Sequence, residues 1–222
     1  MFRYKIIFSR RRTISISVSP DKGVTVRAPL RTPEKTVEKF VTSRSEWVMK
    51  HLENYSNHTR LNGKISDGEK VLFRGKEYII RLLNADYGTV TLSDNDIFVS
   101  APVDKIPSAA ELILKKWFIN EAARMIPDKL REMITKHGSH RFNPSMVTIR
   151  TMKRRWGSCS SKGRITINSE LVKIDDIFTE YVILHELCHL KHHNHGTDYY
   201  KLLSEVFPEW KKVRKELRKY LS

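Results

Sequence analysis

The sequence predicts an α+β fold. Residues 1–107 are expected to form a β-rich region with one helix, and residues 108–222 a mainly helical region. Two observations predict this order. Apolar and polar residues alternate along much of the first region, which is the period of a strand. From Ser108 onward apolar residues recur every three or four positions, which is the period of an amphipathic helix. We therefore expect two domains that meet near Pro107.

The first region is expected to begin with strands. Alternation over Tyr4–Phe8 predicts one strand. Thr13–Val18 and Val24–Val26 predict two more, and the Pro20–Gly23 segment between them is typical of a turn. These segments predict a β-hairpin at the start of the chain.

One helix and a second group of strands follow. Thr32-Pro33-Glu34 combines a capping residue, a proline at the first helical position and an early acid, so a helix is expected from there to about Leu52. Residues 54–68 are polar and rich in turn formers. Lys70–Leu83 and Thr89–Val99 then return to alternation, which predicts strands.

The second region is expected to combine helices with short strands. Helices are expected from Ser108 to Gly138, with a possible kink at Pro127, and at Ile177–His192 and Pro208–Leu221. Strands are expected at Met146–Met152 and Ile165–Ile167. Asp175 and Asp176 form the expected cap of the Ile177 helix.

Charge and composition describe a soluble cytoplasmic protein. Lysine and arginine number 41 against 25 acidic residues, a net charge of +16, which would attract nucleic acid or another polyanion, although solvated helix faces also carry such charge. No apolar run is long enough to cross a membrane. Met1–Ser9 lacks the apolar core of a signal peptide. Cys159 and Cys188 are expected to be reduced thiols. The sequence makes no prediction of an oligomeric state.

The strongest chemical signal is the segment HELCH at His185–His189. On a helix, residues four apart lie one turn apart on one face, so His185 and His189 can bind the same cation. Glu186 follows the first histidine and could hold a water molecule at that cation. A catalytic metal is favoured over a structural one because nitrogen and oxygen ligands leave a position for water.

The third ligand requires a break in the chain. A continued helix would carry His195 away from His189, so we expect Asn194 or Gly196 to adopt a left-handed conformation that turns His195 back. Glu205 is the competing third ligand. His192 and His193 are expected to stay outside the metal shell, and Cys188 is expected to pack inward as a small apolar residue.

Three segments carry a resemblance to a known family: HELCHLKHHNHG from His185, RRWGSCSSKGRITIN from Arg154 and RRRTISISVSPDKGVTVRAP from Arg10. They resemble the YgjP-like metallopeptidases, which are related to the SprT-like and WLM zinc metalloproteases of the zincin class. The resemblance extends over almost the whole chain. It implies a zincin-like core in which the active helix lies beneath a small sheet.

The resemblance also implies roles for individual residues. His185, His189 and His195 would bind one Zn2+ ion, and Glu186 would be the catalytic base. A peptide substrate would add along the edge of the strand Ile165–Asn168. The sequence alone gives no chemical role to the segment Trp156–Cys159, and Trp156 is expected to pack against the active helix.

We therefore expect a zinc metallopeptidase that hydrolyses peptide bonds of a protein or peptide substrate. One alternative is a metal-dependent phosphohydrolase acting on nucleotides, since the same chemistry attacks phosphorus and the +16 charge suits phosphates. Another is a nucleic-acid-associated zinc protein, because Arg10–Arg12 and Lys153–Arg155 are basic clusters. Covalent catalysis by Ser158 or Cys159 is disfavoured because a metal already supplies a better nucleophile. Tyr199 and Tyr200 are expected to be core or rim aromatics.

Overall fold

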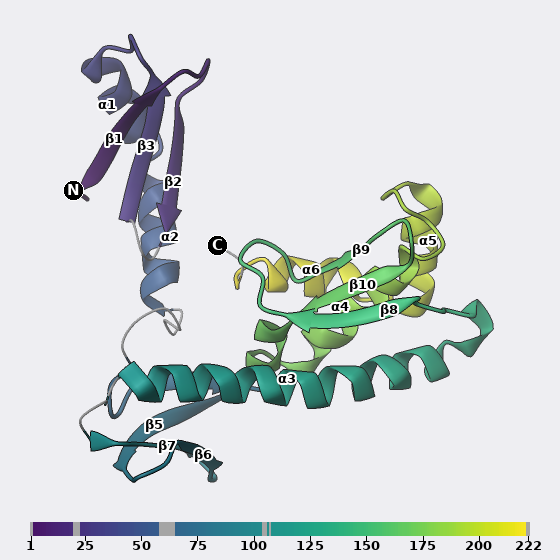
Figure 1. Cartoon of the computed structure of the whole chain (residues 1–222). Coiled ribbons are helices and arrows are strands. Elements are labelled where there is room, and N and C mark those ends of the chain that lie inside the picture. The colour runs from purple at the N-terminus through teal and green to yellow at the C-terminus, as the bar shows by residue number, and fades with distance from the viewer. Residues whose placement is uncertain (1, 20–22, 58–64, 104–105, 107, 221–222) are drawn as a thin grey trace. The chain divides into compact units, whose positions relative to one another are not determined.

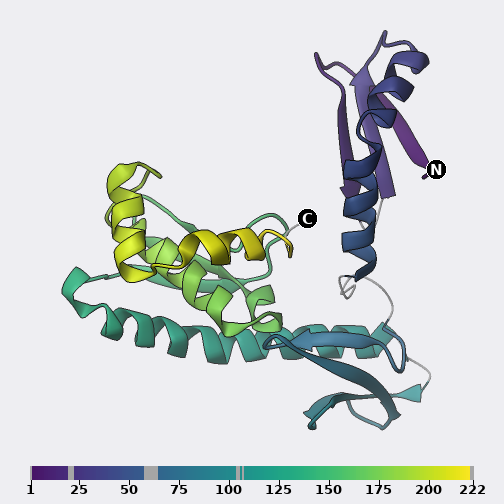
Figure 2. The same ribbon diagram turned by 180° about the vertical axis from the view of Figure 1, so that it is seen from behind.

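The computed structural model describes residues 2–19, 23–57, 65–103, 106 and 108–220. The chain divides into two compact units, Met1–Gly63 and Lys64–Ser222, which are described separately (Figures 1 and 2). The domain boundary that the sequence predicts near Pro107 falls inside the second of these units and stays a prediction.

The first unit contains a three-stranded sheet. Its strands are β1 (Tyr4–Ser9), β2 (Ser15–Ser19) and β3 (Gly23–Pro29), in the order β1-β3-β2. The expected hairpin is confirmed, because β2 and β3 pair antiparallel, while β1 pairs parallel with β3. Residues 20–22 of the predicted turn lie outside the described residues. Alternate residues of β3 face a small apolar core.

Two helices complete this unit, α1 (Glu34–Thr42) and α2 (Ser45–Asn57). The prediction of one helix ending near Leu52 is wrong. The break lies in a segment rich in hydroxyl side chains, where the oxygens of Thr42, Ser43 and Ser45 donate to backbone carbonyls at 2.8–2.9 Å. Such bonds compete with the helix for backbone acceptors.

The second unit begins with a four-stranded sheet in the order β4-β5-β7-β6. The strands are β4 (Lys70–Phe73), β5 (Lys76–Asn84), β6 (Thr89–Leu92) and β7 (Asp96–Ala101). The predicted strand-like segment Lys70–Leu83 forms a hairpin of β4 and β5. Arg74 and Gly75 form its two-residue turn, with φ angles of 51° and 75°. Positive φ at both positions matches the twist of the paired strands.

Helix α3 (Ser108–Lys136) runs along the second unit (Figure 1). It continues through Pro127 as one helix, and η2 (Gly138–His140) follows it. The rings of Phe73 and Trp117 lie 4.8 Å apart between centroids, which packs the β4–β5 hairpin against α3.

A second sheet of this unit has the order β8-β10-β9. Its strands are β8 (Met146–Arg150), β9 (Gly157–Cys159) and β10 (Arg164–Asn168), and η3 (Ser169–Lys173) follows. The strand β9 was not expected from the sequence. β10 pairs with β8 on one side and with β9 on the other. The expectation that residues 165–168 form a free edge is therefore wrong, because β10 is the central strand.

Three helices end the chain: α4 (Asp176–Cys188), α5 (Thr197–Val206) and α6 (Trp210–Leu217). The Asp175 side chain caps α4 as expected and accepts a hydrogen bond of 3.1 Å from the backbone N of Ile177. Helix α4 is buried on most of its surface and contacts β9, β10, α3, α5 and α6. This burial explains why its sequence is apolar nearly all round.

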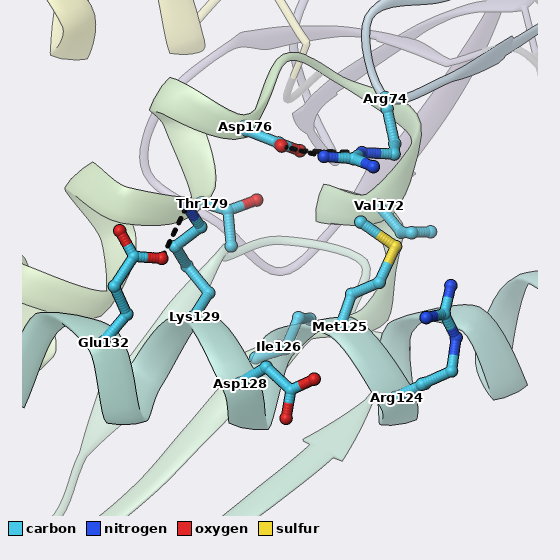
Figure 3. Close-up of a pocket in the computed structure, with 10 residues that line it drawn as sticks. All are labelled: Arg74, Arg124, Met125, Ile126, Asp128, Lys129, Glu132, Val172, Asp176 and Thr179. Carbon is cyan, nitrogen blue, oxygen red and sulfur yellow. Dashed lines mark hydrogen bonds and ion pairs between the residues drawn. The ribbon is translucent and has the colours of Figure 1, made fainter.

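A hollow between α3 and α4 is lined largely by charged side chains (Figure 3). Arg74 from the β4–β5 turn pairs with Asp176, and Lys129 pairs with Glu132 at 3.0 Å. Each charged residue that lines this hollow has an ion-pair partner. In the part of the chain that the structure describes, no helix has the length and apolar character needed to cross a bilayer.

Candidate metal centre

Three histidines converge at the C-terminal end of α4. One ring nitrogen from each of His185, His189 and His195 lies within 4.8 Å of the other two. The Nε2 atoms of His185 and His195 are 3.3 Å apart. Among the described residues, this is the group of possible ligands that could hold a metal ion. The three residues predicted from the sequence therefore lie together.

The chain reverses earlier than expected. Helix α4 ends at Cys188, four residues before His192, and His189 is its C-cap. The turn is closed by the backbone N of His192, which donates to the Cys188 carbonyl at 3.0 Å. The expected left-handed residue is absent: Gly196 has φ −84°, and Asn194 is not among the described residues with positive φ. The early end of α4 brings His195 back without it.

Hydrogen bonds orient two of the imidazoles. The His189 Nδ1 atom lies 3.0 Å from the His192 carbonyl, which can only accept, so Nδ1 carries the proton. The Tyr199 hydroxyl donates to the His185 carbonyl at 3.2 Å and accepts from His185 Nδ1 at 2.6 Å. Both rings are thereby assigned the tautomer in which Nδ1 carries the proton and Nε2 has a free lone pair.

This arrangement fits a divalent cation. Nitrogen ligands of tetrahedral zinc, about 2.05 Å from the ion, lie about 3.3 Å from one another. The His185 to His195 separation has this value. Burial lowers the pKa of His185 to about 3, with a further contribution from His189 and His195. The imidazole is thus neutral at physiological pH, as a metal ligand must be.

Tyr199 is a further residue at this cluster whose contacts the sequence did not predict. Its side chain is fully buried, as expected of a core aromatic. It nevertheless contacts all three histidines, with ring centroids 5.4, 4.6 and 4.7 Å from those of His185, His189 and His195. The position of Tyr199 in the first turn of α5, four residues after His195, is the signal that could have indicated this role.

Glu186 lies buried beside strand β9, with 5% of its surface exposed. Burial raises the pKa of its carboxyl to about 8, and the Arg155 guanidinium acts in the opposite direction. A Cβ atom on Gly157 would lie 2.4 Å from Glu186 Oε1. Only glycine leaves room for this carboxylate, which gives a structural reason for part of the Trp156–Cys159 segment.

The other candidate residues lie elsewhere or are unreactive. Glu205, the competing third ligand, is directed to His140, with Oε1 3.4 Å from Nε2. Cys188 is fully buried, as expected, and burial raises its pKa to about 12. Burial and the nearby charge of Glu186 also raise the pKa of Cys159. Both cysteines are free thiols. Neither is activated as a nucleophile.

Three convergent imidazoles beside a buried carboxyl group are groups that a metal-dependent hydrolase would need. The chain belongs to the YgjP-like metallopeptidase family, whose metallopeptidase domain matches residues 12–220, and the predicted resemblance is confirmed. Among curated proteins, none matches this chain.

Two solved structures are similar to part of the chain. The metallopeptidase zymogen of Pyrococcus abyssi abylysin is 26% identical over 44% of this chain and 95% of its own, with a TM-score of 0.39. The metallopeptidase zymogen of Methanocaldococcus jannaschii jannalysin is 28% identical over 44% of this chain and 97% of its own, with a TM-score of 0.38.

Proposed function

We propose that this protein is a zinc-dependent peptidase with a zincin-like core, in which His185, His189 and His195 hold one zinc ion and Glu186 is the general base. The observation that carries the proposal is the convergence of three ring nitrogens within 4.8 Å. Glu186 lines the same cavity as His185 and His195. Family membership supports peptide hydrolysis as the reaction.

Each residue contributes one task. A zinc ion bound by three neutral imidazoles would supply a Lewis acid and lower the pKa of a bound water toward about 7. A cation held beside Glu186 would favour the ionised form of its carboxyl. The carboxylate would then accept a proton from the attacking water and return it to the departing amine. Tyr199 and the His192 carbonyl would keep His185 and His189 in the tautomer that binds a cation.

The peptide would bind as an extra strand on β9 rather than on β10. β8 and β9 are the two edge strands of this sheet, and β9 is the one that contacts α4. Glu186 lies directly beneath Gly157 of this strand. An extended peptide paired with the free edge of β9 would carry its carbonyl groups close to the proposed base.

The substitution Glu186→Gln tests the reaction. We expect it to lower kcat/KM for peptide hydrolysis by about 100-fold to 10,000-fold, because it removes the proton acceptor and keeps the size of the side chain. Zinc content, measured by elemental analysis of the same sample, should stay unchanged. Equal turnover by wild type and variant would contradict the assigned role.

A second candidate is a metal-dependent phosphohydrolase acting on nucleotides. The observation that favours it is a group of four arginines in the cavity beside Glu186. Nucleoside triphosphates offered with the peptides distinguish the two reactions: phosphate release without peptide cleavage, lost in Glu186→Gln, would select the second candidate.

Two expectations from the sequence belong to this proposal. Free Cys159 and Cys188 suit the reducing cytoplasm, where we expect the protein to act. Contact with nucleic acid or another polyanion is supported by the net charge of +16.

A further inference from the structure

The cavity that contains Glu186 is strongly basic. It encloses about 300 Å³ and is lined by four arginines, Arg154, Arg155, Arg214 and Arg218. Two of them precede β9, one lies in α6, and Arg218 is the C-cap of that helix. Glu186 is the one carboxylate among the residues that line this cavity.

These arginines have no carboxylate at ion-pair distance in the part of the chain that the structure describes. The hollow between α3 and α4 differs in this respect, since each of its charged side chains is paired (Figure 3). Four like charges around one cavity repel one another, and a bound anion would relieve that repulsion.

The fold holds both arginine-bearing segments in place. The side chain of Asn168, only 1% exposed, donates to the carbonyls of Met152 and Arg155 at 2.8 and 2.9 Å and accepts from the backbone N of Met152 at 3.1 Å. On α6, the buried side chains of Val213 and Leu217 anchor the helix, and each directly precedes one of its two arginines. The guanidinium groups therefore come from fixed backbone positions.

We propose that Arg154, Arg155, Arg214 and Arg218 form a specificity subsite for a carboxylate of the peptide substrate, so that the enzyme prefers aspartate or glutamate near the cleaved bond. A guanidinium group matches a carboxylate with two parallel hydrogen bonds. The subsite borders the histidines and Glu186, so the recognised carboxylate lies within a few residues of the reacting carbonyl. This inference rests on the proposed peptidase function.

The test uses the full zinc-loaded chain and peptides that differ only by glutamate, glutamine or lysine at each position around the cleaved bond. We expect kcat/KM to be about tenfold higher for the best glutamate peptide than for its glutamine counterpart, mainly through KM. The preference should weaken as salt is added, because Arg154, Arg155 and Arg218 are exposed and Arg214 is half-buried.

Matched variants test which residues cause the preference for glutamate. Arg214→Gln with Arg218→Gln should remove most of it, whereas Lys212→Gln with Lys215→Gln changes the same net charge on the same helix outside the cavity and should keep it. Arg154→Gln should likewise weaken it, and Lys153→Gln should not. Arg218→Glu should shift the preference toward lysine peptides. Unchanged zinc content and thermal midpoint verify that each variant folds.

The outcomes separate the inference from the proposed function. Equal cleavage of glutamate, glutamine and lysine peptides would overturn the subsite and leave the peptidase intact. A preference that persists in both arginine variants would also overturn it. Failure to cleave any peptide, with Glu186→Gln indistinguishable from wild type, would overturn both.

Discussion

At the scale of single residues, the site includes two contacts that no sequence motif indicates. Gly157 makes room for the Glu186 carboxylate, and the Tyr199 hydroxyl fixes the His185 ring. The proximity of His185, Glu186 and His189 could be predicted from the sequence, because helical geometry alone places them within about one turn. The two supporting residues could not, because they come from a strand and a helix whose packing is not encoded locally.

Gly157→Ala should displace the proposed base. The added methyl group would lie 2.4 Å from Glu186 Oε1, so the carboxylate must move. We expect kcat to fall by about 100-fold while zinc content stays unchanged. Gly138→Ala is the control, since a Cβ there meets no atom within 4 Å. Kinetics of the two variants under identical conditions give the comparison, and full activity in Gly157→Ala would refute the contact.

Tyr199→Phe should weaken metal binding rather than folding. The substitution keeps the buried ring and removes the oxygen that accepts from His185 Nδ1. We expect zinc affinity to fall by about 10-fold to 100-fold in a competition titration with a chromophoric chelator. Tyr87→Phe, at a residue with 71% exposure, should leave the affinity unchanged. An unaltered affinity in Tyr199→Phe would exclude the orienting role.

Glu186 also predicts a pH dependence of the metal-free protein. Its pKa is raised by burial from 4.5 to about 8, so between these values the folded state keeps a proton that the unfolded state has lost. This contribution to stability is fully present below pH 4.5 and is lost as the pH rises through about 8. Urea unfolding at several pH values should show wild type losing stability relative to Glu186→Gln as the pH rises. A pH-independent difference would contradict the shift.

At the scale of elements, the periodicity of apolar residues predicted that most helices and strands exist, but it did not predict where they end. α1 and α2 replace one predicted helix because hydroxyl side chains at 42–45 bind backbone carbonyls. α4 ends at Cys188, where the last turn tightens and the backbone N atoms of Leu190 and Lys191 donate to carbonyls three residues back. β9 was not predicted because three residues, GSC, carry no alternation, and only pairing with β10 makes them a strand.

Asn168→Ala should loosen the loop before β9. The substitution removes the side chain that bonds the backbone of Met152 and Arg155 and leaves these half-buried groups without that partner. We expect the free energy of unfolding to fall by about 3 kcal/mol. Chemical denaturation measures the loss. A change below about 0.5 kcal/mol, the usual range for surface substitutions, would show that the loop is held in another way.

At the scale of the whole molecule, the site lies entirely within the second unit, Lys64–Ser222. The order of most strands and helices could be predicted from periodicity. The pairing of strands that lie far apart in the sequence could not, because packing selects those neighbours. The contacts of Phe73 with Trp117 and of Arg74 with Asp176 tie the β4–β5 hairpin to the helices that follow. These contacts cross the boundary near Pro107.

Two fragments test which boundary applies. We expect residues 64–222 to fold cooperatively and bind zinc, because this segment contains its own core and every proposed ligand. Residues 108–222 should be much less stable, since Phe118, 2% exposed in the full chain, would lose its contact with Phe73. Circular dichroism during heating distinguishes them. Equal stability of the two fragments would favour the boundary near Pro107.

The most direct measurement of the central claim is the zinc content of natively purified protein, determined by elemental analysis for wild type, His195→Ala and Glu205→Ala. We predict one zinc ion per chain in wild type and in Glu205→Ala, and a large loss in His195→Ala, because three imidazoles and not a glutamate complete the site. Full zinc content in His195→Ala, or its loss in Glu205→Ala, would contradict the account.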